Sequence, residues 1–133
     1  MTYHDLLSTL PVRPGDTVYI VWEDEGSWRL TAEHVLYVLF DKEEQLLIKV
    51  NDATDEVIPF DDDLLFTSFT DAVERYSDLN RGVVPPPVES RRVDIVLGEP
   101  LRAVKGRYVL ATDTFYDEDG EPVEYADIRA WMS

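Results

Sequence analysis

The sequence predicts an α+β fold, mostly antiparallel β-sheet, in which one helix packs on a β-meander or partly open barrel and a second small β unit follows. Three observations favour this class. Most apolar residues lie in short runs rich in β-branched and aromatic side chains, separated by turn-forming residues. One segment, 69–80, has the period of an amphipathic helix. Three consecutive prolines at 85–87 then divide the chain.

The first part, residues 1–82, is predicted to form the meander. Before it, Leu6, Leu7 and Leu10 have helical spacing, and Pro11 limits them to a short helix or turn. The apolar run 34–40 is continuous, so its period fits a buried strand or a short helix; the hairpin-like pattern around it favours a strand. The predicted strands are 17–22, 28–30, 34–40, 45–50 and 57–60. The predicted turns are 14–16, 23–27, 41–44 and 51–55.

The helix has the most specific signals. Ser68 is a suitable N-cap, and Asp71 three residues later imitates a capping box and favours the positive end of the helix dipole. Gly82 is suited to end the helix. Four apolar side chains recur at helical spacing and define the buried face: Phe69, Val73, Tyr76 and Leu79.

The remainder divides into a proline-rich linker, 83–90, and a small β unit, 91–133. Prolines 85–87 keep the linker extended and semi-rigid. Strands are predicted at 93–97, 101–104 and 107–112, with turns at 105–106 and 117–120. The end, 123–132, fits a helix or a strand, and we favour the strand.

Charge and composition exclude several functions. The chain has 133 residues, 28 acidic and 12 basic, for a net charge of −16, of which −12 falls in residues 1–82. Such a charge argues against direct binding to nucleic acid or to an anionic membrane. The absence of cysteine excludes disulfides, cysteine-ligated metals and a thiol nucleophile. The N-terminus has no signal-peptide pattern and no run is long enough to span a bilayer, so we expect a cytoplasmic protein.

Catalytic and metal motifs are weak. Three consecutive carboxylates, Asp61–63, cannot all face one cation, and a calcium-loop alignment of 113–120 places Phe115 at the first ligand position. The two histidines, His4 and His34, belong to no nucleophile motif. We therefore predict no enzyme activity, no cofactor and no metal. A small hydrolase using His34 and a carboxylate is the least favoured alternative.

The acidic clusters are the most unusual feature. They recur at the predicted turns of the meander and could share one rim. An array of carboxylates imitates nucleic-acid phosphates and would attract a Lys/Arg-lined surface; ordinary solubility is the alternative explanation. The acids that flank Trp22 and Trp28 indicate a cationic partner, with Trp28 as a possible anchor. The candidate partner-binding residues are Glu23, Asp24, Glu25, Trp28, Asp61, Asp62 and Asp63.

Two parts of the chain resemble known proteins. The first contains Pro-Gly-Asp-Thr-Val-Tyr-Ile-Val at 14–21, Val-Ile-Pro-Phe at 57–60 and Leu-Phe-Thr-Ser-Phe-Thr-Asp-Ala-Val-Glu-Arg at 65–75. Residues 12–80 thereby resemble small uncharacterised proteins of phages and mobile elements of Gram-positive bacteria, which pair a β-meander with a helix. The tail, with Gly-Arg-Tyr-Val-Leu-Ala-Thr-Asp at 106–113 and a closing Trp-Met at 131–132, resembles another small phage-associated β module.

The resemblance implies an accessory phage or prophage gene, among which small acidic proteins inhibit host defence nucleases, as anti-CRISPR and anti-restriction proteins do. No functional residues carry over from it. The leading hypothesis is a non-enzymatic inhibitor whose acidic loops block the DNA-binding or PAM-reading surface of a bacterial CRISPR effector nuclease. The alternative is a phage structural or assembly adaptor that binds another phage protein and owes its charge to solubility.

Overall fold

The computed structural model describes residues 10–50, 57–60 and 63–133. Within these ranges it contains one α-helix and three antiparallel sheets, so the predicted α+β class is confirmed. The sheet expected as one meander or partly open barrel is divided into two, and none of the sheets in this part of the chain closes into a barrel. The predictions for residues 1–9 and 51–55 lie outside the described residues. No helix in the described ranges is long and apolar enough to cross a membrane.

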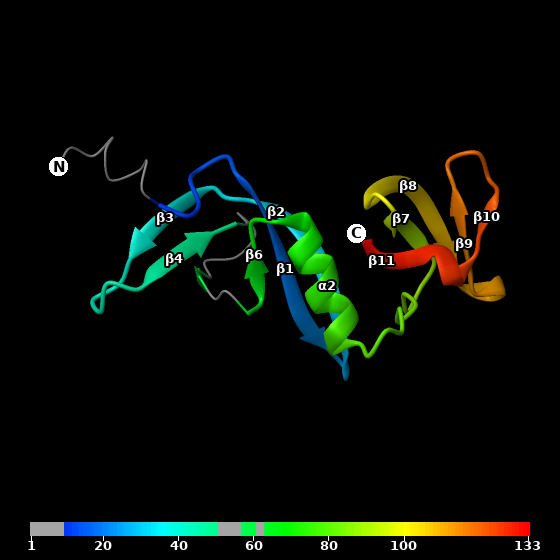
Figure 1. Cartoon of the computed structure of the whole chain (residues 1–133), viewed down its shortest axis with the longest axis horizontal. Coiled ribbons are helices and arrows are strands. Elements are labelled where there is room, and N and C mark those ends of the chain that lie inside the picture. The colour runs from blue at the N-terminus through cyan, green and yellow to red at the C-terminus, as the bar shows by residue number, and fades with distance from the viewer. Residues whose placement is uncertain (1–9, 51–56, 61–62) are drawn as a thin grey trace.

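The first sheet has the strand order β2-β1-β6 (Figure 1). Its strands are β1 (Thr17–Asp24), β2 (Ser27–His34) and β6 (Leu65–Phe66). The loop predicted at 23–27 is shorter than expected, because β1 and β2 pair as far as Asp24 and Ser27. Glu25 and Gly26 form the turn with φ of 52° and 88°. Two left-handed residues match the twist of the flanking strands, so a two-residue turn suffices.

The second sheet has the order β3-β4-β5. Its strands are β3 (Tyr37–Phe40), β4 (Leu46–Lys49) and β5 (Ile58–Pro59). The strand favoured at 34–40 is confirmed, with a break after β2. At the break the chain changes partner: Val35 N–H donates to Asp16 O at 2.8 Å, whereas Leu36 N–H donates to Lys49 O of β4 at 2.7 Å. A buried apolar cluster joins the first two sheets: Val12, Val18, Val35, Ile48 and Leu65.

The helix α2 (Phe69–Leu79) confirms the strongest sequence prediction. Ser68 caps it by accepting a hydrogen bond from Asp71 N at 3.3 Å. Gly82, with φ of 76°, follows the helix and donates its N–H to Ser77 O at 2.8 Å. Val73 and Tyr76 are buried on the predicted face, and Phe69 packs on Tyr19 of β1 with ring centroids 5.1 Å apart.

The third sheet has five strands in the order β10-β9-β8-β7-β11. They are β7 (Arg91–Leu97), β8 (Arg102–Val109), β9 (Thr114–Asp117), β10 (Pro122–Val123) and β11 (Ile128–Met132). Two 3-10 turns, η1 (Leu110–Thr112) and η2 (Tyr125–Asp127), connect them. The turn predicted at 117–120 is confirmed by Gly120 N donating to Asp117 O. The strand favoured at 123–132 is confirmed only from residue 128, as β11, because η2 occupies 125–127.

The turn predicted at 105–106 is wrong, because β8 runs through it without interruption. Gly106 is required there for a different reason. A Cβ at this position would collide with the carbonyl oxygen of Tyr116 and lie 2.7 Å from Ile95 Cδ1. This glycine therefore lets β8 fit between its neighbours β7 and β9, and a close approach of this kind leaves the same sequence signal as a turn.

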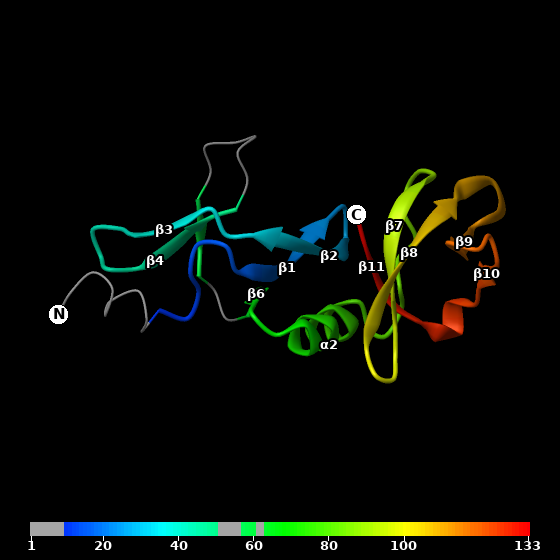
Figure 2. The same ribbon diagram turned by 90° about the horizontal axis from the view of Figure 1, so that it is seen from above.

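The proline-rich segment lies against the third sheet. Pro87 is buried, and Pro85 O accepts a hydrogen bond from Trp131 Nε1 at 2.6 Å. Figures 1 and 2 show the C-terminal strand β11 beside the β1–β2 hairpin and α2. One buried cluster, which we call the shared core, accordingly combines residues from both sides of the prolines: Val21, Leu30, Ala72, Val73, Tyr76, Val96, Ala130 and Met132.

Candidate interaction surface at the hairpin tip

The tip of the β1–β2 hairpin presents the first group of candidate residues. Glu23 and Glu25 are exposed there, on either side of the half-buried Asp24. The turn is held at its base, where Ser27 Oγ donates to Asp24 O at 3.2 Å. Glu25 adopts the left-handed conformation, which disfavours a non-glycine residue by about 1 kcal/mol. The tip therefore holds a carboxylate at a position where glycine or asparagine would be locally more stable.

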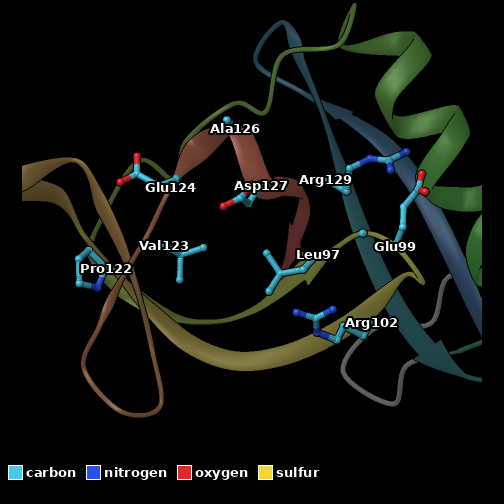
Figure 3. Close-up of a pocket in the computed structure, with 10 residues that line it drawn as sticks. Leu97, Glu99, Arg102, Pro122, Val123, Glu124, Ala126, Asp127 and Arg129 are labelled. Carbon is cyan, nitrogen blue, oxygen red and sulfur yellow. The ribbon is translucent and has the colours of Figure 1, made fainter.

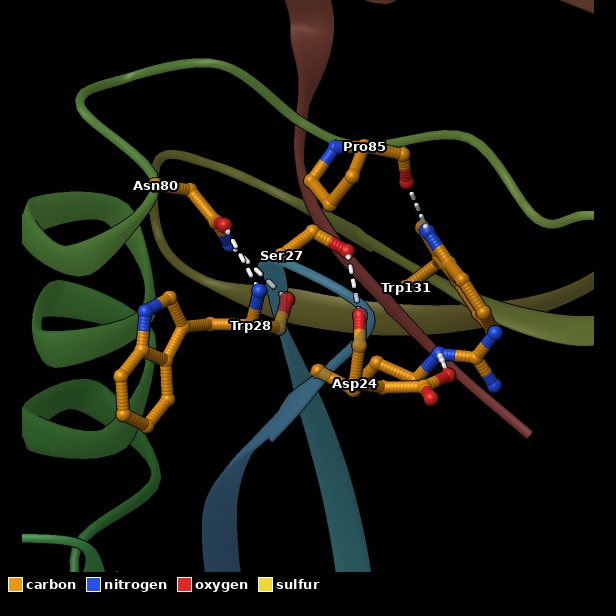
Figure 4. Close-up of polar contacts among 7 residues, drawn as sticks. Asp24, Ser27, Trp28, Asn80, Pro85 and Trp131 are labelled. Atoms are coloured by element: carbon orange, nitrogen blue, oxygen red, sulfur yellow. Dashed lines mark hydrogen bonds and ion pairs between the residues drawn. The ribbon is translucent and has the colours of Figure 1, made fainter.

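The carboxylate of Asp24 is neutralised within the molecule (Figure 4). Its Oδ2 lies 2.9 Å from Arg29 Nε, and register places Arg29 directly opposite Trp22. The Arg29 guanidinium lies 5.7 Å from the ring centroid of Trp22 and 5.4 Å from that of Trp131. These cation–π contacts join the hairpin to β11 and keep Arg29 turned toward the protein. The exposed charge of the tip consequently comes from Glu23 and Glu25.

Trp28 has an internal position. Its N–H donates to Asn80 Oδ1, and its carbonyl accepts from Asn80 Nδ2, both at 3.0 Å (Figure 4). Asn80 thus pairs with the edge of β2 as a neighbouring strand would, and attaches the hairpin to the end of α2. The ring packs against the shared core. Of the three tryptophans, Trp22 is the most accessible to a partner, with 38% of its surface exposed.

Sequence reasoning did not select Trp22, although the strand period contains the signal. Positions 18, 20 and 22 share one face of β1, opposite the face of Tyr19 and Val21. Val18 and Ile20 pack against the second sheet, whereas Tyr19 and Val21 pack in the shared core with α2. Trp22 therefore follows the face of Val18 to the end of the strand, where it remains partly exposed.

The second acidic cluster is described only at Asp63, because Asp61 and Asp62 lie outside the described residues. In β6, Leu65 pairs with Ile20, and Leu64 O accepts from Val21 N at 2.9 Å. One step further along this antiparallel register, the exposed Asp63 is level with Trp22. The structure thus brings Asp63 beside the strand that carries Glu23 and leads to Glu25.

The outer face of α2 adds acids that sequence reasoning did not assign to the site. Asp71, Glu74 and Asp78 are all exposed, and their i, i+3, i+7 spacing places them along one face of the helix. Arg75 turns away from this row and donates from Nε to Asp63 O at 3.2 Å. We call Glu23, Glu25, Asp63, Asp71, Glu74 and Asp78 the acidic surface.

The remaining candidates lie elsewhere. The turn between β3 and β4, where Glu43 and Glu44 are exposed, is at the opposite end of the first part from the hairpin tip, so these clusters do not form one rim (Figure 1). His34 lies at the exposed end of β2 with Nδ1 3.3 Å from Thr17 Oγ1; within the described residues no hydrogen bond joins it to a carboxylate. Over the same ranges, no group of three or more His, Asp or Glu side chains is arranged to hold a metal ion.

Known proteins add no constraint to this geometry. Comparisons with protein-family models, with curated proteins and with solved structures give no match. The resemblance to phage accessory proteins stays a prediction from the sequence.

Proposed function

We propose that the protein is a non-enzymatic inhibitor that binds a bacterial nucleic-acid-handling protein, most specifically a CRISPR effector nuclease, and blocks its DNA-binding or PAM-reading surface. The acidic surface would take the place of nucleic-acid phosphates in a groove lined by Lys and Arg. The geometry of the β1–β2 tip carries this proposal.

Rigidity distinguishes this tip from ordinary surface acidity. The backbone at Glu23 and Glu25 is held by a two-residue turn and by the hydrogen bonds between Asn80 and Trp28. The contacts of Arg29 with Trp22 and Trp131 add to this restraint. The backbone that carries these carboxylates therefore loses little conformational freedom on binding, so more of their electrostatic attraction appears as affinity.

The net charge of −16 supports the same partner class. Attraction between the acidic surface and a basic groove accelerates encounter and weakens as salt rises, because the Debye length is about 10 Å at 0.1 M salt. An inhibitor of this kind needs no cofactor, metal or catalytic group.

A capture experiment tests the proposal. Tagged protein is incubated with lysate of a bacterium that carries CRISPR and restriction systems, and bound proteins are identified after washes at low and moderate salt. We expect a DNA-binding nuclease that is retained at low salt and released at moderate salt. In a gel-shift assay with that purified nuclease, the wild-type protein should displace duplex DNA.

Two double variants with equal loss of charge make the test specific. Glu23→Gln/Glu25→Gln should weaken displacement about tenfold or more, as expected for two charged contacts. Glu43→Gln/Glu44→Gln removes the same charge at the opposite end and should displace DNA like the wild type. Equal effects of the two variants would reduce the proposal to unspecific charge, and an unchanged tip variant would contradict it.

Exposed apolar side chains favour the phage adaptor as a second candidate. Leu36, Tyr37 and Phe40 on and beside β3 are 39%, 47% and 47% exposed, which suits a contact with another protein. Under this alternative, Tyr37→Ser/Phe40→Ser would abolish capture of a phage structural protein. The Glu23→Gln/Glu25→Gln variant would leave that capture intact.

A further inference from the structure

A cavity of about 520 Å³ lies where three segments of the shared core region meet. The end of α2 forms one wall, the start of the proline-rich segment a second, and the chain from η2 into β11 a third. Its volume is typical of small-molecule sites. Among the residues that line it are Tyr76, Val83, Val84, Tyr125, Ile128 and Arg129.

The side chain of Tyr125, which forms one wall, is held in position before any ligand binds. Its hydroxyl donates to Asp113 Oδ1 at 2.6 Å, and the same oxygen accepts from Tyr108 OH at 2.6 Å. The ring of Phe115 meets that of Tyr125 edge-on, with centroids 5.5 Å apart. A tyrosine held at its hydroxyl and its ring presents a constant apolar surface, so little ordering remains to be done when a ligand enters.

Tyr76 supplies a second wall and an unusual polar group. The residue is 1% exposed, and its hydroxyl has no hydrogen-bond partner among the described residues. Buried polar groups are almost always paired, so this hydroxyl is a local cost to the fold. Because its oxygen is buried, Tyr76 contributes other atoms of the residue to the cavity wall.

Arg129 is the single charged residue of the lining. Its side chain passes over Gly98, where a Cβ would lie 3.0 Å from Nη1. It forms no ion pair with any carboxylate of the described residues. A second, more open hollow of about 710 Å³ shares Ala126 and Arg129 with the cavity and carries Glu99, Glu124 and Asp127 (Figure 3).

We infer that this cavity binds a compact apolar group that carries one carboxylate. The apolar group would lie among Val83, Val84 and Ile128, and the carboxylate would pair with the planar donor fork of Arg129. The three acids of the neighbouring hollow oppose any negative charge, so the site suits a ligand with a single carboxylate placed directly on Arg129. The same chemistry is found in a free carboxylic acid and in the C-terminus of a peptide that ends in an apolar residue.

Titration of the 15N-labelled full-length protein tests the inference, with phenylacetate as the probe and phenylacetamide as its neutral control. We expect saturable shifts of the amide signals of Val83, Val84, Ile128 and Arg129 at about millimolar phenylacetate, an affinity suited to so small a ligand. The amide should bind at least about tenfold more weakly, since it cannot pair with the guanidinium. Equal binding of acid and amide, or an absence of saturable shifts, would overturn the inference.

A second titration distinguishes a peptide C-terminus from a free carboxylic acid as the ligand. A tetrapeptide that ends in phenylalanine is titrated with a free and with an amidated C-terminus. Binding of the free form more tightly than phenylacetate assigns the site to chain termini, and tighter binding of phenylacetate assigns it to free acids.

Two arginine variants locate the contact. Arg129→Gln should weaken phenylacetate binding about tenfold. Arg102→Gln, in the neighbouring hollow only, should leave it within about twofold. The opposite order would overturn the assignment. The Glu23→Gln/Glu25→Gln variant should bind phenylacetate like the wild type. The cavity inference and the proposed function can therefore fail independently of each other.

Discussion

Asp113 joins β8 and η2 through a single carboxylate oxygen. Tyr108 and Tyr125 both donate to its Oδ1 at 2.6 Å. The residue follows η1 in the left-handed conformation, with φ of 48°, which aspartate tolerates better than most residues. The hydrogen bond from Tyr108, and then that from Tyr125, lower the pKa of the Asp113 carboxyl from its ordinary value of 3.8.

The lowered pKa predicts an acid-sensitive contribution to stability. Because the folded pKa lies below the unfolded one, the contribution is complete above pH 3.8 and is lost as the pH falls through the folded value. Carboxyl NMR should show Asp113 titrating below 3.8, and Tyr108→Phe should raise its pKa. In urea denaturation, Asp113→Asn should lack the part of the acid destabilisation that is due to this residue. Titration of Asp113 at its ordinary pKa in the wild type would contradict the prediction.

At the scale of elements, β8 depends on a residue without a side chain. Gly106 is flanked on both sides by strand residues, and the adjacent strands leave no room for a Cβ. The obstacles are a backbone carbonyl of β9 and the end of Ile95 in β7, a fully buried side chain. The backbone carbonyl cannot move without displacing the ladder, so the strain of a larger residue falls on the whole sheet.

Gly106→Ala should therefore destabilise the protein by about 1–3 kcal/mol, the usual effect of overpacking. Urea denaturation followed by circular dichroism measures the change. Lys105→Ala, at the exposed neighbouring position in the same strand, is the control and should change stability by less than about 0.5 kcal/mol. A Gly106→Ala protein as stable as this control would show that β8 and β9 are further apart than described.

At the scale of the whole molecule, the shared core joins the parts before and after the prolines. Val96, Ala130 and Met132 from the third sheet pack with Val21, Leu30 and Tyr76. The Trp131–Pro85 hydrogen bond and the Arg29–Trp131 contact reinforce the same junction. Since each part buries apolar surface against the other, we expect them to unfold in one cooperative transition.

Fluorine-labelled tryptophan follows this transition separately in each part, through Trp28 and Trp131. Their unfolding midpoints should coincide. Met132→Ala should lower both midpoints together and destabilise the protein by about 2 kcal/mol, as loss of a buried methionine side chain does. Val88→Ala, at a position 67% exposed, should lower neither. A loss of stability seen by Trp131 alone would show that the two parts fold independently.

The sequence by itself determined the features that depend on near neighbours in the chain. The helix with its Ser68 cap, the turns at 14–16 and 117–120, most strands and the net charge follow from period, local hydrogen bonds and composition. Within the site, the exposed Glu23 and Glu25 were also predictable, because acids beside a glycine between two strands favour an exposed turn.

The tertiary structure alone decided the features that join distant positions. Asn80 binds the backbone of Trp28 across 52 residues, and Pro85 holds the ring of Trp131 across 46. The close approach of β9 keeps Gly106 inside a strand, and pairing of β6 with β1 brings Asp63 to the acidic tip. Such pairings depend on which surfaces meet, and the order of residues contains no local signal for them. The Arg129 cavity is also a tertiary feature, because its walls combine residues 76–84 with residues 125–129.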